Sequence, residues 1–322
     1  AGTFQQSTAF AAGSGAFAVA TADLNGDGKL DLVVTNNTGG NASVLIGNGD
    51  GTFQAATTLS TQLNPFAVAI DDIDADGDAD IVIANLSSDS ISVMLGNGTG
   101  SFAAQQIYAV GDAPEGVVLG DFNGDGIIDA IATGANGSSD YLLLGNGNGT
   151  FAAASAIAIA GRATDVATGD FNGDGKLDIV TTNANTNTAS VSLGNGLGGF
   201  TTSAISVGAY PLGVVVADLN GDGKLDFVTT NNVSNHISVL LGNGDGTFQA
   251  QLNYSTGLGP THVATADFDQ DGKLDLIVTN AGSISAFHGN GNGTFNAAVT
   301  YNAGATPGRI TTGDFNGDGL VD

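Results

Sequence analysis

Residues 23–31 read DLNGDGKLD, and this nine-residue pattern recurs along the whole chain. Asp stands at positions 1, 5 and 9 of every copy and Gly at position 6; the copies occupy residues 23–31, 72–80, 121–129, 170–178, 218–226, 267–275 and 314–322. Successive copies begin 47 to 49 residues apart. A constant period of this length predicts a repeat architecture in which each copy marks one structural unit.

A second repeated element follows each of the first six loops. It reads GNGDGTF at residues 47–53 and recurs at 96–102, 145–151, 194–200, 242–248 and 289–295, while residues 1–4 (AGTF) are similar to the end of another copy. The closely spaced glycines predict a tight turn with positive backbone φ angles. The final Phe is expected to pack between neighbouring units.

The segments around both elements predict β-strands. In the first unit, strands are expected at about 17–22, 31–36, 43–46 and 53–59, so that the DLNGDGKLD loop joins the first two. No apolar period of 3.6 residues persists, and helix should be nearly absent. Four short strands per repeat of 40 to 50 residues are typical of a propeller blade. We therefore expect an all-β fold, a seven-bladed β-propeller of four-stranded antiparallel blades of about 49 residues.

The domain prediction is one propeller spanning residues 1–322. When the repeats are aligned, Asp322 matches Asp31 and Ala1 matches Asp50, which leaves 18 positions of one unit uncovered. The seventh blade is therefore expected to be incomplete and the chain to be a fragment of a longer protein.

The acidic residues are concentrated in the loops. Of 32 Asp and Glu residues, 24 lie in the seven nine-residue copies. Two carboxylates about 4 Å apart repel by about 1 kcal/mol in water and about 4 kcal/mol at intermediate dielectric. The simpler alternative is that Asp, Asn and Gly are turn formers. Seven copies in register favour a cation, and Ca²⁺ accepts six to eight oxygen ligands in flexible geometry, whereas Mg²⁺ requires a strict octahedron.

Two further features of the loops suit a metal site. Gly at position 6 permits the chain to wrap round an ion. Position 7 varies in residue type, as expected if only its backbone carbonyl faces the metal. Positions 2 and 8 are always apolar and are interpreted as anchors to the core.

The loops and turns together resemble the FG-GAP/VCBS repeats of bacterial surface proteins, which are related to the integrin α-subunit propeller and to propeller lectins. The resemblance covers essentially the whole chain. It implies seven blades, about seven Ca²⁺ ions bound between the first and second strands, an extracellular location, and an adhesive or ligand-binding role. The ligands that it implies, with the backbone carbonyl at position 7, are Asp23, Asn25, Asp27, Lys29, Asp31, Asp72, Asp74, Asp76, Asp78, Asp80, Asp121, Asn123, Asp125, Ile127, Asp129, Asp170, Asn172, Asp174, Lys176, Asp178, Asp218, Asn220, Asp222, Lys224, Asp226, Asp267, Asp269, Asp271, Lys273, Asp275, Asp314, Asn316, Asp318, Leu320 and Asp322.

Composition excludes several classes of partner. Six basic residues against 32 acidic ones give a net charge of −26, which disfavours nucleic acid and anionic membrane surfaces. No stretch is long and apolar enough to insert into a membrane. There is no Cys, so disulfides and thiolate chemistry are impossible. The expected partner is a protein or glycan ligand of unknown identity at the cell surface, and self-association is possible.

No catalytic group is predicted. His236, His262 and His288 stand at different offsets in their repeats, and Glu115 is the sole Glu. The segment five to eight residues before each loop differs most between repeats; it contains Phe17, Phe66, Glu115, Arg162, Asp165, Tyr210, His262 and Arg309. Such residues suit a ligand site near the ring opening, although drift at exposed positions is an equal alternative.

Three functions follow as hypotheses: an adhesion or protein-interaction module, a structural element of a surface layer or filament, and a carbohydrate-binding lectin. The absence of Trp weakens the lectin hypothesis, because sugar faces usually stack on aromatic rings.

Overall fold

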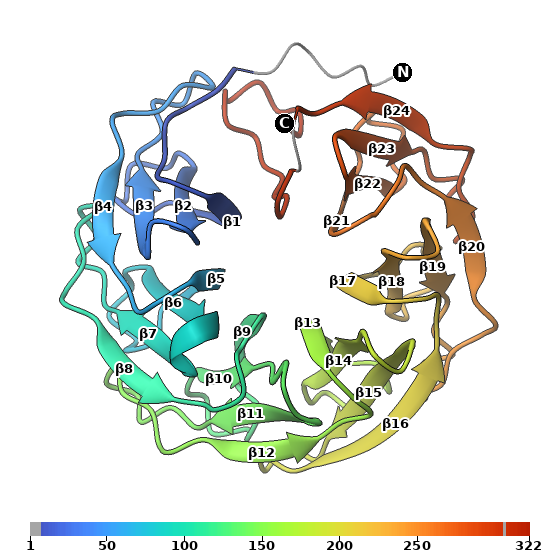
Figure 1. The fold of residues 1–322 in the computed structure, drawn as a ribbon, viewed down its shortest axis with the longest axis horizontal. Coiled ribbons are helices and arrows are strands. Elements are labelled where there is room, and N and C mark those ends of the chain that lie inside the picture. The colour runs from blue at the N-terminus through green and yellow to red at the C-terminus, as the bar shows by residue number, and fades with distance from the viewer. Residues whose placement is uncertain (1–7, 305–306) are drawn as a thin grey trace.

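A computed structural model describes residues 8–304 and 307–322 of the chain. Six antiparallel sheets of four strands stand like blades around a common axis (Figure 1). Within each blade the strands follow chain order from the innermost to the outermost. The short strands and the propeller architecture that the sequence predicts are therefore confirmed.

The six blades comprise strands β1 to β24. Blade 1 contains β1 (Ala16–Ala22), β2 (Asp31–Asn36), β3 (Asn41–Leu45) and β4 (Thr57–Ser60); blade 2 contains β5 (Pro65–Asp71), β6 (Asp80–Asn85), β7 (Ser90–Met94) and β8 (Gln106–Ala109); blade 3 contains β9 (Val117–Gly120), β10 (Asp129–Ala132), β11 (Ser139–Leu143) and β12 (Ser155–Ala158). Blade 4 contains β13 (Ala163–Gly169), β14 (Asp178–Asn183), β15 (Thr188–Gly194) and β16 (Phe200–Ser206); blade 5 contains β17 (Pro211–Ala217), β18 (Asp226–Asn231), β19 (His236–Leu240) and β20 (Leu252–Ser255); blade 6 contains β21 (Val263–Ala266), β22 (Asp275–Asn280), β23 (Ser283–Phe287) and β24 (Val299–Asn302).

Helix is nearly absent, as predicted. Among the described residues the one helical segment is a three-residue 3₁₀ turn, η1 (Leu86–Ser88). The first two strands of the first unit lie within one residue of the predicted bounds, whereas the third begins two residues earlier, at Asn41, and the fourth begins later, at Thr57. Phe53 instead forms an isolated bridge with Gly47 across the turn.

The prediction of seven blades is wrong, because the described residues form six. The seventh Asp loop, at residues 314–322, folds between blade 6 and blade 1, but no strand is formed at 307–322 (Figure 1). A nine-residue loop closes through its own hydrogen bonds, whereas a blade requires four paired strands. Counting loops therefore overestimates the blades by one. The similarity of residues 1–4 to a further turn lies outside the described part of the chain.

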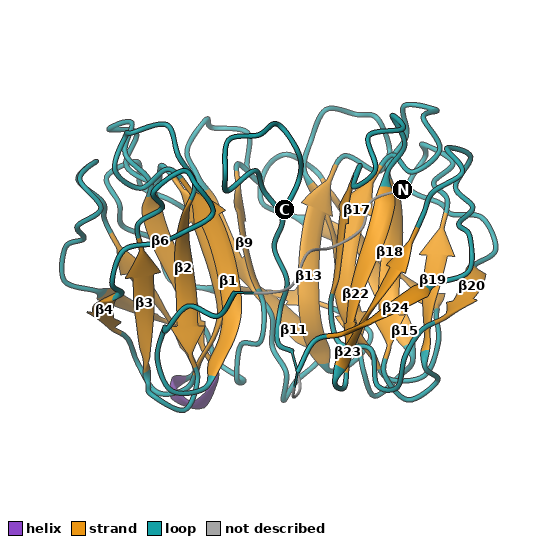
Figure 2. Cartoon of the chain, turned by 90° about the horizontal axis from the view of Figure 1, so that it is seen from above, coloured by secondary structure: helices purple, strands orange, loops and turns teal. Residues whose placement is uncertain are grey.

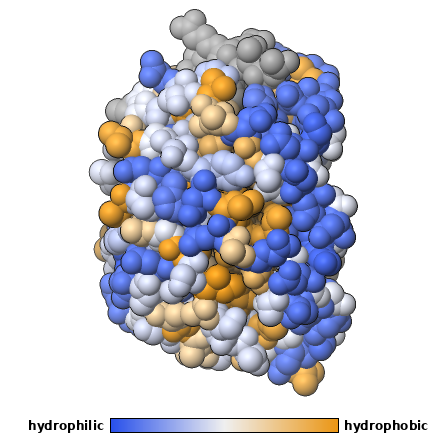
Figure 3. Space-filling view, turned by 90° about the vertical axis from the view of Figure 1, so that its right-hand side faces the viewer, coloured by the Kyte–Doolittle hydropathy of each residue, from blue (hydrophilic) through white to orange (hydrophobic). Residues whose placement is uncertain are grey.

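The hydrophobic core lies between the blades. Strands such as β6 are buried on both faces because neighbouring sheets cover them. One core cluster joins Leu24 and Val33 of blade 1 to Ile81, Ile83 and Met94 of blade 2. The outer strands are more exposed, and Figure 3 shows one side of this wall as polar residues with apolar side chains scattered among them.

The two ends of the propeller carry different parts of the sequence. Because the strands alternate in direction, the Asp loops and the glycine-rich turns lie at one end, which we call the loop end. The opposite end carries the short β2–β3-type turns, including the connection at η1, and the segments that lead into the innermost strands (Figure 2). We call it the entry end.

Candidate metal loops and axial cluster

The first Asp of each loop accepts hydrogen bonds from the loop backbone. In the first loop, Asp23 Oδ1 accepts the N–H of Gly26 at 2.8 Å and Oδ2 accepts the N–H of Gly28 at 2.7 Å. Asp314 binds Gly317 and Gly319 in the same way, although no blade surrounds its loop. The same hydrogen bonds therefore form within the nine residues whether or not the loop joins two strands.

Glycine at position 6 adopts the predicted positive φ in all seven loops. The value is 80° for Gly28, and it ranges from 79° to 93° over the seven copies. Position 4 also has positive φ in every loop. Five loops have Gly there, whereas Ala75 and Gln270 adopt 61° and 58° in the other two. These two loops hold a conformation that costs non-glycine residues free energy.

The Asp at position 9 is buried and connects the two repeated motifs. Asp31 Oδ2 accepts the N–H of Leu24 in its own loop at 2.9 Å, and Oδ1 accepts the N–H of Gly47 in the following turn at 2.7 Å. The same pair of bonds is formed in all six blades. Burial raises the pKa of Asp31 despite these two hydrogen bonds. Asp322, at the same position of the seventh loop, is exposed.

Replacing one of these buried carboxylates is expected to destabilise the fold even without metal. Asp226→Ala leaves the N–H groups of Leu219 and Gly242 without their acceptor, and we expect the free energy of unfolding to fall by about 2 kcal/mol in EDTA. Asp222→Ala, in the same loop but exposed, is the control and should change it by less than about 0.5 kcal/mol. Urea denaturation measures both, and equal effects would contradict a separate role for position 9.

The loop carboxylates converge as a cation site requires. Oxygen atoms of Asp72, Asp74 and Asp80 lie within 4.8 Å of one another. Asp74 Oδ1 is buried without a hydrogen-bond partner among the described residues. Burial and the neighbouring charge of Asp76 raise the pKa of Asp74. An unpaired buried oxygen inside an acidic cluster fits a hard cation, so the residues present suit Ca²⁺.

The loop of blade 6 has an additional polar group. Asp267, Asp269 and Asp271 cluster within the same 4.8 Å limit, and Asp269 Oδ1 is buried without a partner among the described residues. His288 Nδ1 lies 3.4 Å from Asp269 Oδ2 and 3.6 Å from Asp275 Oδ2. The equivalent position before the other five turns is Ile or Leu. The sequence shows that His288 replaces an aliphatic residue at this position, but only the folded structure shows that His288 lies beside the Asp loop.

The lysines at position 7 bind the loop through their side chains as well. Lys29, Lys176, Lys224 and Lys273 each lie within 4.0 Å of the Asp at position 5, for example Lys176 Nζ at 3.1 Å from Asp174 Oδ2. These exposed pairs contribute little to stability. They place all four lysines of the chain at the loop end. The predicted ligand role of the position 7 carbonyls stays a prediction.

Loops and turns of neighbouring blades are also linked to each other. The N–H of Gly100 in the turn of blade 2 donates to the carbonyl of Leu24 in the loop of blade 1, and Gly246 donates to Phe171 in the same way. The turn phenylalanine Phe248 packs against Phe171 of the preceding blade with ring centroids 5.7 Å apart. The predicted packing of this Phe between units is confirmed. These hydrogen bonds and ring contacts connect each blade to the next.

The variable residues gather at the entry end. Glu115 forms an ion pair with Arg162, whose Nη1 also donates to the hydroxyl of Tyr210 at 2.6 Å. Arg309 Nη1 lies 2.7 Å from Asp165 Oδ1, and its Nη2 donates to the backbone carbonyl of Glu115. The only Glu and both Arg residues of the chain thus meet in one place, which we call the axial cluster. Glu115 and Asp165 are buried, so their variation between repeats is not drift at exposed positions.

Backbone irregularities direct these side chains. Strands β1, β5, β13 and β17 each show a register shift against their neighbour where the variable segment enters the sheet. Buried threonines then accept the freed N–H groups, for example Thr182 from Asp165 at 3.1 Å in blade 4 and Thr230 from Gly213 at 2.8 Å in blade 5. A β-bulge changes the direction of a side chain without ending the strand.

The three histidines are not brought together by the fold. His236 Nδ1 lies 3.1 Å from Asn231 Nδ2, His262 contacts the ring of Phe17, and His288 lies at the loop of blade 6. No helix in the described part of the chain is long and apolar enough to cross a membrane.

Known proteins share this architecture. The chain resembles the structure of an Agrocybe aegerita lectin that recognises non-reducing terminal N-acetylglucosamine, with 23% identity, a TM-score of 0.62, and coverage of 88% of this chain and 80% of that one. Virginiamycin B lyase from Staphylococcus aureus matches with 12% identity, a TM-score of 0.62 and coverage of 90% and 85%. The Vibrio cholerae biofilm matrix protein Bap1 matches with 14% identity, a TM-score of 0.53 and coverage of 94% and 72%. At these identities the likeness shows the fold alone.

The fold and its repeated loops define a β-propeller protein built from internal repeats. The model of the FG-GAP-like repeat family matches seven overlapping segments that together cover the chain: 1–34, 23–83, 72–132, 124–181, 170–229, 218–278 and 267–322. The chain belongs to the FG-GAP-like repeat family. None of the curated proteins matches its sequence.

Proposed function

We propose that this propeller is a Ca²⁺-stabilised extracellular binding module that attaches to a protein or glycan ligand at the cell surface. The observation that carries the proposal is the separation of the two ends of the molecule. The repeated acidic loops lie at one end, with unpaired buried oxygens on Asp74 and Asp269, and the non-repeated charged residues lie at the other. Such a division suits a metal-stabilised scaffold that presents a distinct ligand site.

The loop residues would hold the metal through oxygen atoms. In a loop such as 72–80, the carboxylates of Asp72, Asp74 and Asp80 already lie close together. When bound, Ca²⁺ would neutralise their mutual repulsion. Seven ions carry +14 and would change the net charge of the chain from −26 to −12. Extracellular modules bind Ca²⁺ with dissociation constants of roughly 0.1 to 1 mM, which matches the location that we propose.

Counting the bound ions tests the metal part of the proposal. Equilibrium dialysis is expected to give about seven Ca²⁺ per chain, and Asp170→Asn combined with Asp174→Asn should remove one of them. Asp245→Asn is the matched control, because it removes an exposed carboxylate from a turn whose equivalents in blades 3 and 6 are Asn148 and Asn292. Fewer than three bound ions would refute the proposal.

The attachment function has its own test and two alternatives. Beads coated with the protein should adhere to cell surfaces in Ca²⁺ and detach in EDTA. The lectin alternative is supported by the similarity to a fold that recognises N-acetylglucosamine in another protein, and a uniformly blank glycan array would exclude it. The structural alternative predicts ordered self-association in Ca²⁺, so strictly monomeric particles in sedimentation would contradict it.

A further inference from the structure

One repeat position lines a cavity at the entry end. Six residues before each Asp loop stand Phe17, Phe66, Glu115, Thr164, Leu212, Thr261 and Gly308, and all seven border a single cavity of about 230 Å³. Two positions later every repeat has Val, or Ile310 in the last. The backbone scaffold is therefore repeated, while the side chains that face the axis differ in size and charge.

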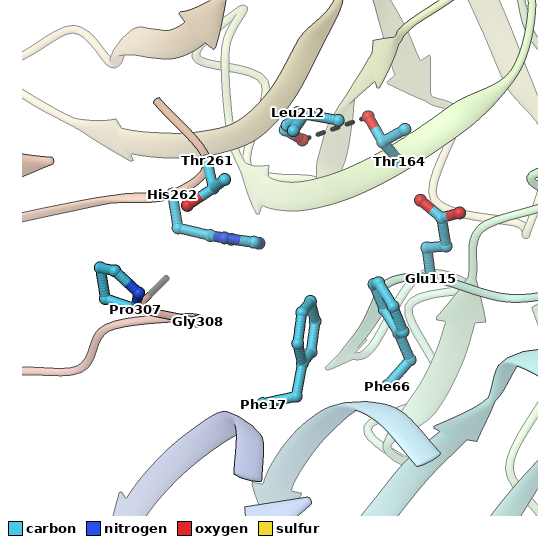
Figure 4. Close-up of a pocket in the computed structure, with 9 residues that line it drawn as sticks. All are labelled: Phe17, Phe66, Glu115, Thr164, Leu212, Thr261, His262, Pro307 and Gly308. Carbon is cyan, nitrogen blue, oxygen red and sulfur yellow. Dashed lines mark hydrogen bonds between the residues drawn. The ribbon is translucent and has the colours of Figure 1, made fainter. Parts of the chain in front are cut away.

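The cavity has an aromatic side and an acidic side. The rings of Phe17 and Phe66 lie 4.2 Å apart between centroids, and His262 meets Phe17 edge-on (Figure 4). Glu115 extends from blade 3 on another side, close to Thr164 (Figure 4). Its side chain is only 9% exposed. The cavity thus brings the carboxylate and the aromatic rings together.

Among the described residues that line the cavity, Glu115 is the only charged one. Arg162 binds its Oε1 but does not line the cavity, and it is also bonded to Tyr210. Arg309 is paired with Asp165. Arg162 occupies Oε1 of Glu115, whereas no hydrogen bond from the described residues reaches Oε2. Burial raises the pKa of Glu115, and both arginines act in the opposite direction. Burial and nearby Arg309 lower the pKa of His262 well below its usual range, which leaves its imidazole neutral.

We propose that this axial cavity binds an alkylammonium group, with the ammonium at Glu115 and the hydrocarbon part against Phe17 and Phe66. Aromatic faces attract cations, most strongly where water is excluded. The chain's net charge of −26 raises the local concentration of cations. The inference rests on the proposed role as a binding module and specifies the chemistry of one ligand.

Other ligand classes fit the cavity less well. An anion would approach Glu115 without a free cation to receive it, since both arginines are paired. A hexose needs partners for several hydroxyls, but the hydroxyl of Thr164 is already bonded to the backbone carbonyls of Pro211 and Leu212, at 3.0 and 3.1 Å. Few polar atoms of the lining therefore remain for a sugar.

Calorimetric titration in saturating Ca²⁺ tests the proposal with matched probes. Cyclohexylammonium should bind one per chain and at least tenfold more tightly than cyclohexanol, while cyclohexanecarboxylate should give no measurable heat. Glu115→Gln should weaken the binding of cyclohexylammonium at least tenfold, and Phe66→Leu about fivefold. Asp245→Asn, which removes one negative charge at the loop end, should leave the affinity within twofold.

Equal affinity for the amine and the alcohol in the unmodified protein would overturn the proposal, as would preferential binding of methyl glucoside. That comparison needs no variant, so it stands even where Glu115→Gln fails to fold. Nα-acetyl-lysine amide tests whether the ammonium group can come from a lysine side chain, whereas cyclohexylammonium tests a free amine. Binding of one or the other supports the proposal that the cavity takes an alkylammonium group. The count of Ca²⁺ on the same samples reports the metal proposal separately from the cavity.

Discussion

In excess EDTA the melting temperature of the protein is expected to fall by about 20 to 30 °C from its value in saturating Ca²⁺. One ion at a hundred times its dissociation constant adds about 2.7 kcal/mol to the free energy of unfolding, so seven independent sites would add roughly 19 kcal/mol. A chain of 322 residues has an unfolding entropy of roughly 0.7 kcal/mol/K, which converts that sum to a shift of about 20 to 30 °C.

The position of the loops explains why the loss should affect the whole ring. The backbone carbonyl of the apolar residue at position 2 accepts a hydrogen bond from the neighbouring blade, for example Leu24 from the N–H of Gly100. The carboxylate at position 9 accepts a hydrogen bond from the turn that follows, for example Asp31 from the N–H of Gly47. Without a cation, repulsion among Asp72, Asp74 and Asp80 would loosen the segment that carries both contacts. Loosening of the loops thereby weakens the contacts between blades.

Screening by salt must be separated from specific binding. Potassium chloride at equal ionic strength reduces repulsion between exposed carboxylates, but it should restore only a few degrees of the lost melting temperature. Restoring Ca²⁺ should recover all of it. An unchanged melt in excess EDTA, or full recovery by potassium chloride, would contradict the metal proposal.

The local structure of each repeat was predictable because it depends on short-range patterns. The strands, the turn and the loop with its positive φ at Gly28 follow from residue types within about 50 positions. The same reasoning explains the wrong blade number. The loop at 314–322 has the complete nine-residue pattern. Asp314 therefore accepts hydrogen bonds from the N–H groups of Gly317 and Gly319, although residues 307–322 form no strand.

Contacts between repeats were not predictable from their spacing. Asp31 was predicted only as a metal ligand, yet it also bonds Gly47, sixteen residues later. The link from Gly100 to Leu24 crosses between blades and has no signal in either motif alone. In the axial cluster, Arg309 and Asp165 are separated by 144 residues, and only closure of the ring brings them within 2.7 Å. The sequence identified these residues as variable but did not pair them.

A buried carboxylate in blade 3 is expected to have a large effect on the free energy of unfolding and on its pH dependence. Asp140 on β11 is fully buried and accepts a 2.6 Å hydrogen bond from the hydroxyl of Thr181 on β14 of blade 4. The equivalent residues of the other blades are apolar: Ala42, Ile91, Ala189, Ile237 and Ile284. Burial raises the pKa of Asp140 from 3.8 to about 7, against the opposing effect of its hydrogen bonds.

The direction of the pH dependence follows from this raised pKa. Below about pH 4 the carboxyl is protonated in both the folded and the unfolded chain. As the pH rises toward 7, the unfolded chain loses the proton while the folded one keeps it, so the free energy of unfolding falls. Above pH 7 the whole difference of about three pKa units opposes folding, which amounts to about 4 kcal/mol.

Asp140→Asn removes this titration and is expected to stabilise the protein by about 2 to 4 kcal/mol at pH 8. Its advantage over the unmodified chain should grow by about 2 kcal/mol between pH 5.5 and pH 8. Urea denaturation in saturating Ca²⁺ measures both, and comparison at each pH cancels the titration of the loop carboxylates. Asp245→Asn, which removes an exposed carboxylate, should change the free energy of unfolding by less than about 0.5 kcal/mol at either pH. If the free energies of unfolding of Asp140→Asn and the unmodified protein differ by the same amount at both pH values, Asp140 is ionised throughout this range. Another group would then stabilise its buried negative charge.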